Sequence, residues 1–106
     1  MSGISTHVLD TAKGVPACGI KVRLEAAFGD SWTEVARGVT DDNGRIAQLL
    51  SGDALNSGAY RLTFTVEAED SFYPEITVQF RVRDPESHYH IPLLLSPYGY
   101  TTYRGS

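Results

Sequence analysis

Two histidines and one arginine are the side chains of this sequence best suited to move protons and to hold a fixed positive charge. His7 lies among apolar neighbours in "ISTHVLD", and His90 opens the apolar run "IPLLL". Arg45 directly follows a predicted turn. Imidazoles exchange protons near neutral pH, and a guanidinium is always charged. Because buried polar groups are costly unless they are paired, these residues predict a functional pocket if the fold brings them together.

Metal binding is a second chemistry that the histidines allow. His88 and His90 are two residues apart, share one face of a strand, and could bind a transition metal together with His7. No cysteine or carboxylate stands at a recognisable ligand spacing, so we expect no metal. Cys18 has no histidine beside it in the sequence, which favours a small packed thiol over a nucleophile. The sequence also has no glycine-rich phosphate loop and no serine-hydrolase motif.

Strands must position these residues, because alternation of apolar and polar side chains is the main pattern of the chain. In "YRLTFTV", for example, every second residue is apolar. The predicted strands are residues 4–10, 19–27, 32–39, 45–48, 59–67, 75–83, 88–95 and 99–105. About eight short strands in 106 residues predict one all-β domain, residues 1–106, folded as an antiparallel β-sandwich. The pair Asn43-Gly44 tolerates positive φ angles, so we expect a tight hairpin turn there.

Two strands do not have one clearly polar face. "IPLLL" is apolar at every position, and neither face of "ISTHVLD" is strongly hydrophilic. In a two-layer sandwich only one face of each sheet meets the core, so the other face needs a cover. A partner subunit is the cover that we expect, and loops of the same chain are the alternative.

Composition limits the partners and the compartment. The formal net charge of -4 argues against nucleic acid and anionic membranes as partners, because both require a basic surface. No apolar run approaches the length of a membrane span. A single cysteine favours a reducing compartment, and the first residues lack the features of a secretory signal. We therefore expect a soluble, cytoplasmic protein.

Three segments carry a more specific signal when they are taken together. They are "ISTHVLDTAKGVPACGIKVRL" near the start, "TDDNGRI" in the middle and "HYHIPLLLSPYGYTTYRGS" at the end. They resemble the 5-hydroxyisourate hydrolase family, the transthyretin-related enzymes of urate catabolism. The hormone-carrying transthyretins share "VLD" and "LLSPY" but lack the terminal Tyr-Arg-Gly-Ser and a histidine at the position of His7. Both features are present here, which favours the enzyme over the carrier.

The resemblance implies a fold, an assembly and a set of site residues. It implies a transthyretin-like sandwich assembled as a homotetramer, with active sites at the dimer–dimer interface and 5-hydroxyisourate as substrate. The implied catalytic residues are His7, Arg45, His90 and Ser106. His7 and Arg45 also contact substrate in this interpretation, together with Tyr103. No cofactor and no metal are implied.

One segment departs from the family pattern, and two other functions stay open. Family members commonly have a short helix between the strands predicted at 59–67 and 75–83, but "EAEDSFYP" leaves room for little more than a turn. A binding protein of the carrier type could use the same interface without chemistry. A purely structural sandwich would use the histidines only in packing.

Overall fold

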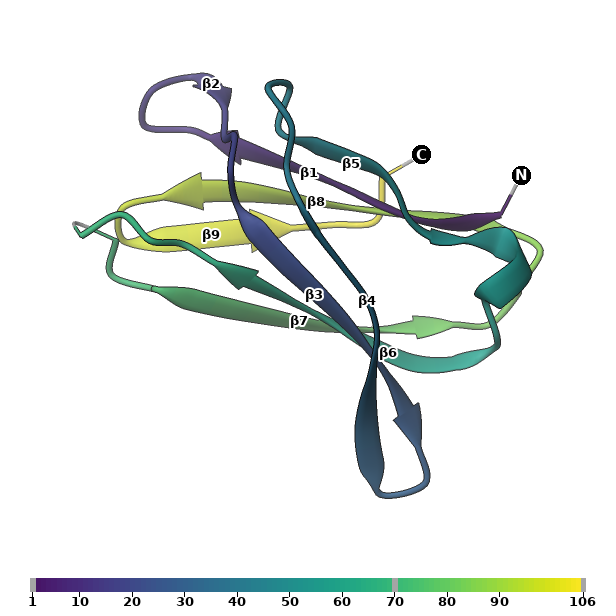
Figure 1. Cartoon of the computed structure of the whole chain (residues 1–106). Coiled ribbons are helices and arrows are strands. Elements are labelled where there is room, and N and C mark those ends of the chain that lie inside the picture. Colours follow the sequence, from purple (N-terminus) through teal and green to yellow (C-terminus); the bar gives the residue numbers. More distant parts are fainter. Residues whose placement is uncertain (1, 70, 106) are drawn as a thin grey trace.

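The protein is a two-layer β-sandwich with both layers built almost entirely of strands (Figure 1). The structure is a computed structural model and describes residues 2–69 and 71–105. Within these residues no helix is long and apolar enough to cross a membrane. The two layers of strands confirm the expected all-β sandwich.

The first sheet is centred on β1 (Gly3–Asp10). β8 (His88–Ser96) runs along one side of β1, and β9 (Gly99–Thr102) lies beyond β8. The other side of β1 pairs with β5 (Arg45–Ser51) and with the short β2 (Val15–Pro16). Strands from both ends and the middle of the chain thus meet at β1.

The second sheet contains four antiparallel strands in the order β4, β3, β6, β7. Their bounds are Lys21–Phe28 for β3, Ser31–Val39 for β4, Gly58–Thr65 for β6 and Glu75–Val82 for β7. A single turn of 3-10 helix, η1 (Gly52–Ala54), follows β5.

The alternating apolar residues face the core, as the sequence pattern predicts. Val22 and Leu24 of β3 are buried, and so are Leu62 and Phe64 of β6. From the first sheet, the largest fully buried side chains are Ile4, Val8 and Leu93. Polar residues between these positions therefore point to the two outer faces of the sandwich.

Two details differ from the expected antiparallel sandwich. β1 and β8 are parallel, with Gly3 opposite His88 and Asp10 opposite Leu95. The turn at Asn43-Gly44 does not close a hairpin, because β4 belongs to the second sheet and β5 pairs with β1. Of these two residues, only Gly44 has a positive φ, of 73°. The dipeptide signalled a turn correctly, but a local pattern does not say which sheet the next strand joins.

The shortened segment between β6 and β7 forms turns and bends in its described residues and contains no helix there, as expected.

The two strands that lack a clearly polar face, β1 and β8, are partly covered on their outer side by the single chain. In β8, Pro92 is buried and Leu94 is half-buried. Leu9 of β1 is half-buried too. The chain itself therefore covers part of the second face of the first sheet.

Candidate active site

β1 and β5 bring His7 and Arg45 side by side. The two residues are directly opposite each other in the antiparallel pairing of these strands. Side chains at such positions share one face of the sheet, with Cβ atoms about 4.5–5.5 Å apart. Val8 is buried in the core, so its neighbour His7 points to the outer face. Two residues that lie 38 positions apart in the sequence thus reach the same surface.

Hydrogen bonds in the turn before Arg45 fix the start of β5 beside β1. The Asp41 carboxylate accepts hydrogen bonds from the backbone N–H groups of Asn43 and Arg45, both at 2.9 Å. The backbone N–H of Val8 donates to the carbonyl of Gly44 at 2.7 Å. A Cβ atom at Gly44 would run into the carbonyl oxygen of Val8, so glycine is required. The hydrogen bond from Arg45, above all, lowers the pKa of Asp41.

β8 adds two histidines from the other side of β1. His90 is opposite Ser5 in the parallel pairing, and His88 lies two residues earlier on the same face. The Ser5 hydroxyl is 2.8 Å from Nε2 of His88 and 2.8 Å from Nδ1 of His90. One buried serine therefore connects both rings through hydrogen bonds.

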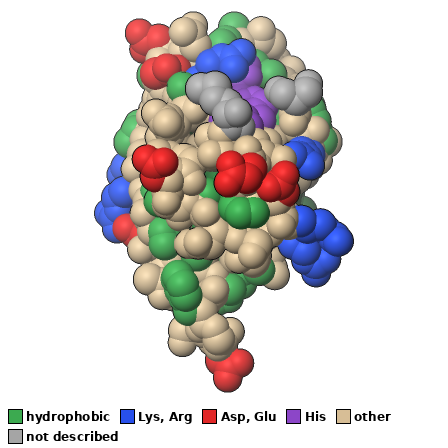
Figure 2. All heavy atoms as spheres, turned by 90° about the vertical axis from the view of Figure 1, so that its right-hand side faces the viewer, with side chains coloured by type: hydrophobic (Ala, Val, Ile, Leu, Met, Phe, Trp, Pro, Cys, Tyr) green, Lys and Arg blue, Asp and Glu red, His purple; other side chains and the backbone are tan. Residues whose placement is uncertain are grey.

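These side chains line a cavity of about 260 Å3 on the outer face of the first sheet. Its lining residues are Ser5, Thr6, Arg45, Ala47, His88 and His90. His7 lies on the same face, two residues along β1 from Ser5. The volume is slightly below the range of about 300–1,000 Å3 typical of drug-sized ligands, which suits a small substrate. Figure 2 shows the histidine side chains gathered in one surface patch close to basic side chains.

The surroundings of His90 favour its neutral imidazole. Partial burial lowers the pKa of His90 most, and repulsion by the positive charge of Arg45 lowers it further, followed by the effects of His7 and His88. His90 is therefore able to exchange protons as a neutral ring near neutral pH. Burial, the larger cause, depends on the packing of the fold and cannot be read from the sequence.

The chain end runs along His90. The backbone N–H of Gly105 donates to the His90 carbonyl at 2.8 Å. A Cβ atom at Gly105 would lie 2.6 Å from Cδ2 of the His90 ring, so glycine allows this close approach. The guanidinium of Arg104 stacks 4.4 Å above the ring of Tyr89. Ser106, predicted to be catalytic, lies outside the described residues, but Gly105, directly before it, is held against His90.

Tyr103 is placed apart from the histidines. Its side chain is 54% exposed and lines a different cavity of about 360 Å3 between β7 and the β8–β9 pair. Within the single chain, the structure therefore brings together His7, Arg45 and His90 but not Tyr103.

Sequence reasoning did not select Ser5 or Asp41, and it considered His88 only as a metal ligand. Asp41 starts the "DDNG" turn, and its Asx-type hydrogen bonds were a readable signal. The contact of Ser5 with His88 and His90 follows from the parallel register of β1 and β8, which the sequence does not show. Within the described residues, no group of three or more His, Cys, Asp or Glu side chains is arranged to hold a metal ion.

The sandwich and the cavity together define a small β-sandwich protein with a pocket lined by histidine and arginine on one outer face. A family model described as the HIUase/Transthyretin family matches residues 4–105. The chain is 43% identical to a 5-hydroxyisourate hydrolase of Deinococcus radiodurans, covering 98% of this chain and 96% of that protein. This protein belongs to the HIUase/Transthyretin family.

Solved structures of a 5-hydroxyisourate hydrolase and of a transthyretin have a fold similar to that of this protein. The 5-hydroxyisourate hydrolase of Klebsiella pneumoniae is 37% identical and matches with a TM-score of 0.85 over 99% of this chain and 100% of that one. The transthyretin of Sparus aurata is 32% identical, with a TM-score of 0.90 over 99% and 97% of the two chains. The fold thus matches a 5-hydroxyisourate hydrolase and a transthyretin alike, and the residues of the site must distinguish them.

Proposed function

We propose that this protein is a 5-hydroxyisourate hydrolase of urate catabolism. In this reaction water opens the ring at an amide-type C–N bond and gives 2-oxo-4-hydroxy-4-carboxy-5-ureidoimidazoline. The observation that carries the proposal is the meeting of His7, Arg45 and His90 on one face, in a chain 43% identical over nearly its whole length to a protein named as this hydrolase.

The arrangement supplies what hydrolysis of an amide needs: a base for water, a charge for the oxyanion and a donor for the leaving nitrogen. His7 takes a proton from the attacking water. Arg45 stabilises the negative charge that develops on the carbonyl oxygen, since its guanidinium is charged at all relevant pH values. His90 orients the substrate or gives a proton to the leaving nitrogen. Ser106 positions this network, and Tyr103 contacts the purine-like ring.

We propose further that the active assembly is a cytoplasmic homotetramer with sites at the dimer–dimer interface. The half-buried Leu9 and Leu94 on the outer side of the first sheet support an interface there. β7 and β9 are the outermost strands of their sheets and flank the same cavity. Unpaired edges of this kind favour strand pairing with a second copy. Sedimentation at micromolar concentration should give a tetramer, and a stable, active monomer would contradict the interface model.

A carrier function is the second candidate, because the fold also matches transthyretin. Mixing the protein with freshly generated 5-hydroxyisourate and following the ultraviolet absorbance separates the two. We expect decay faster than in buffer. Unchanged decay with saturable binding of the compound would support the carrier, and unchanged decay without binding would support a purely structural role.

A further inference from the structure

A hydrogen-bonded chain of three side chains lies behind the proposed acid–base site. Ser5 bridges Nε2 of His88 and Nδ1 of His90 at 2.8 Å on each side. Both distances are short for hydrogen bonds between nitrogen and oxygen. The Ser5 residue is only 6% exposed, so water does not compete freely for its hydroxyl.

The protons of this chain are coupled. A serine hydroxyl has one proton to donate and lone pairs to accept with. If Ser5 donates to one ring, the other ring must donate its own N–H to Ser5. The proton positions on His88 and His90 therefore depend on each other.

The geometry also fixes which edge of His90 is available to substrate. Its Nδ1 is bonded to Ser5, and its Cδ2 side lies against Gly105. The Nε2 side is left for the cavity that His90 lines. A proton given to the leaving nitrogen therefore comes from Nε2.

A neutral His90 has a difficulty in this role. Burial and the charge of Arg45 lower its pKa, so its neutral form dominates near neutral pH. A neutral ring that loses its Nε2 proton becomes an unfavourable imidazolate, unless Nδ1 gains a proton in the same step.

We propose that His88 and Ser5 form a proton relay that supplies this second proton to His90. The inference rests on the proposed hydrolase function. His88, as imidazolium, gives its Nε2 proton to Ser5 Oγ, and Ser5 gives its hydroxyl proton to Nδ1 of His90. His90 gives its Nε2 proton to the leaving nitrogen, which keeps the electron pair of the broken C–N bond. Ser5 ends as a hydroxyl, and His88 and His90 end as neutral rings.

In this relay Ser5 and His88 are positioning residues that act through His90. The groups facing His90 from the neighbouring strands are His7 on β1 and Arg45 on β5, while His88 lies on β8 itself. In the relay His88 is the proton donor, while burial and then Arg45 favour the neutral form of His90.

The test compares three variants in the absorbance assay. Ser5→Ala removes the relay and should lower kcat about 10- to 100-fold with little change in KM, at or below the lower limit of the roughly 10²- to 10⁴-fold contribution of acid–base groups, because the relay acts only through His90. Ser5→Thr keeps a hydroxyl and should restore most of this loss. The matched control is Ser96→Ala, which removes a serine hydroxyl bonded to the Gly99 carbonyl at the far end of β8, and it should keep wild-type kcat.

His88→Gln separates a relay from a structural hydrogen bond. A glutamine amide can still bond to Ser5, but it cannot store a proton. The relay predicts a loss of kcat as large as that of Ser5→Ala, whereas a structural role predicts near-normal turnover. Rates in mixtures of light and heavy water should curve for the wild type, because several protons move together, and should become linear for Ser5→Ala.

The outcomes are distinct. If the wild type is active but Ser5→Ala and His88→Gln both stay within twofold of its kcat, the relay is wrong and the hydrolase function stands. If the wild type does not accelerate decay, the proposed function fails and the relay fails with it. Circular dichroism identifies a misfolded Ser5→Ala, in which case the kcat of folded His88→Gln decides.

Discussion

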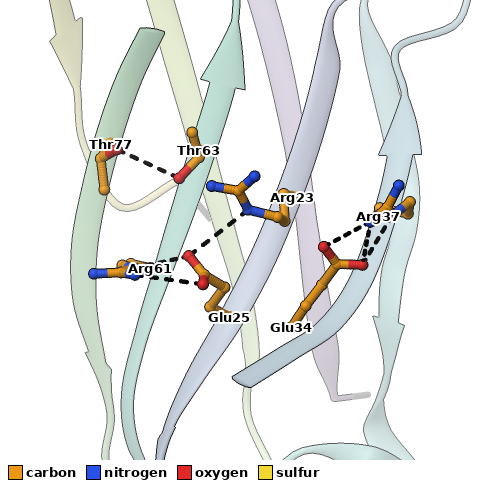
Figure 3. Close-up of polar contacts among 7 residues, drawn as sticks. All are labelled: Arg23, Glu25, Glu34, Arg37, Arg61, Thr63 and Thr77. Atoms are coloured by element: carbon orange, nitrogen blue, oxygen red, sulfur yellow. Dashed lines mark hydrogen bonds and ion pairs between the residues drawn. The ribbon is translucent and has the colours of Figure 1, made fainter. Parts of the chain in front are cut away.

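The two outer faces of the sandwich use arginine in opposite ways. On the second sheet Arg61 bonds to Glu25 at 2.8 Å, and Arg37 bonds to Glu34 at 2.8 Å, so carboxylates balance the positive charges (Figure 3). On the first sheet, Arg45 makes no salt bridge to any residue that the structure describes, and it lies opposite His7.

In the proposed mechanism, the arginines with carboxylate partners support the fold, and Arg45 serves the chemistry. Paired surface charges contribute modestly to stability, and their hydrogen-bonding groups are already satisfied. Hydrogen bonds from Arg61 lower the pKa of Glu25, which keeps that carboxylate charged. An arginine without such a partner keeps its charge available for substrate oxygens. We therefore expect substitutions on the two faces to change different measurements.

Removal of Gly105 and Ser106 should have the largest effect on the histidine-bearing face. The Gly105 N–H bonds to the His90 carbonyl, so the chain end is part of the support of His90. Displacing an orienting group by about 1 Å can cost on the order of 10²-fold in rate. Turnover in the absorbance assay should fall at least that far while the protein stays folded. Full activity in the shortened protein would show that the chain end is not part of the site.

Gly105→Ala should also displace His90 and should cause a smaller loss of turnover than removal of the two residues. The added methyl group would lie 2.6 Å from Cδ2 of His90, so the ring must shift. We expect kcat to fall between about 10- and 100-fold. Gly99→Ala is the matched control, because its Cβ would make an ordinary contact of 3.5 Å with Ser96. Equal activities of the two variants would contradict a close fit between Gly105 and His90.

The pH dependence of stability should separate the two faces. The pKa of His90 is lowered in the folded state, so the unfolded chain binds its proton first as pH falls below about 6.5, and stability decreases from there down to the folded pKa. The folded state also lowers the pKa of Glu25, so stability again decreases as pH falls. This contribution is fully present above the ordinary pKa of 4.5 and is lost as pH falls through the folded pKa. Melting temperatures measured across this pH range should fall less below pH 6.5 for His90→Gln than for the wild type. Those of Glu25→Gln should fall less below pH 4.5.

Glu25→Gln should have the smallest effect on function. The side chain is 13% exposed and bonds to Arg61 at 2.8 Å, with Arg23 at 3.8 Å. Losing these interactions should lower the melting temperature by a few degrees and leave turnover at the wild-type level. A large loss of activity with unchanged stability would mean that this face takes part in the chemistry.

The sequence was sufficient to locate the core strands, but not to pair them. Alternation located the strands of the second sheet to within a few residues because burial of one face imposes a period of two. β1 and β8 were also predicted, although neither has a clearly polar face. The sequence could not show that β1 and β8 are parallel, since pairing direction depends on residues distant in the chain. For the same reason it could not show that Ser5 meets His88 and His90, although it selected His90.

The family motifs contributed what periodicity could not. His7, Arg45 and His90 were selected individually as misplaced polar residues, and the resemblance predicted that they act together. The structure places His7 opposite Arg45 and lines one cavity with Arg45 and His90. The role of Tyr103 stays a prediction, since within one chain its side chain lines a different cavity.

The most direct test of the account is a paired measurement on one arginine from each face. Arg45→Ala and Arg37→Ala each remove a guanidinium, and the absorbance decay of fresh 5-hydroxyisourate is followed with both and with the wild type. We expect kcat/KM to fall by about 10²- to 10³-fold for Arg45→Ala, the size expected for a lost oxyanion contact, and to stay within about twofold for Arg37→Ala. Equal losses in both variants, or a normal rate with Arg45→Ala, would contradict the assignment of the active site to the histidine-bearing face.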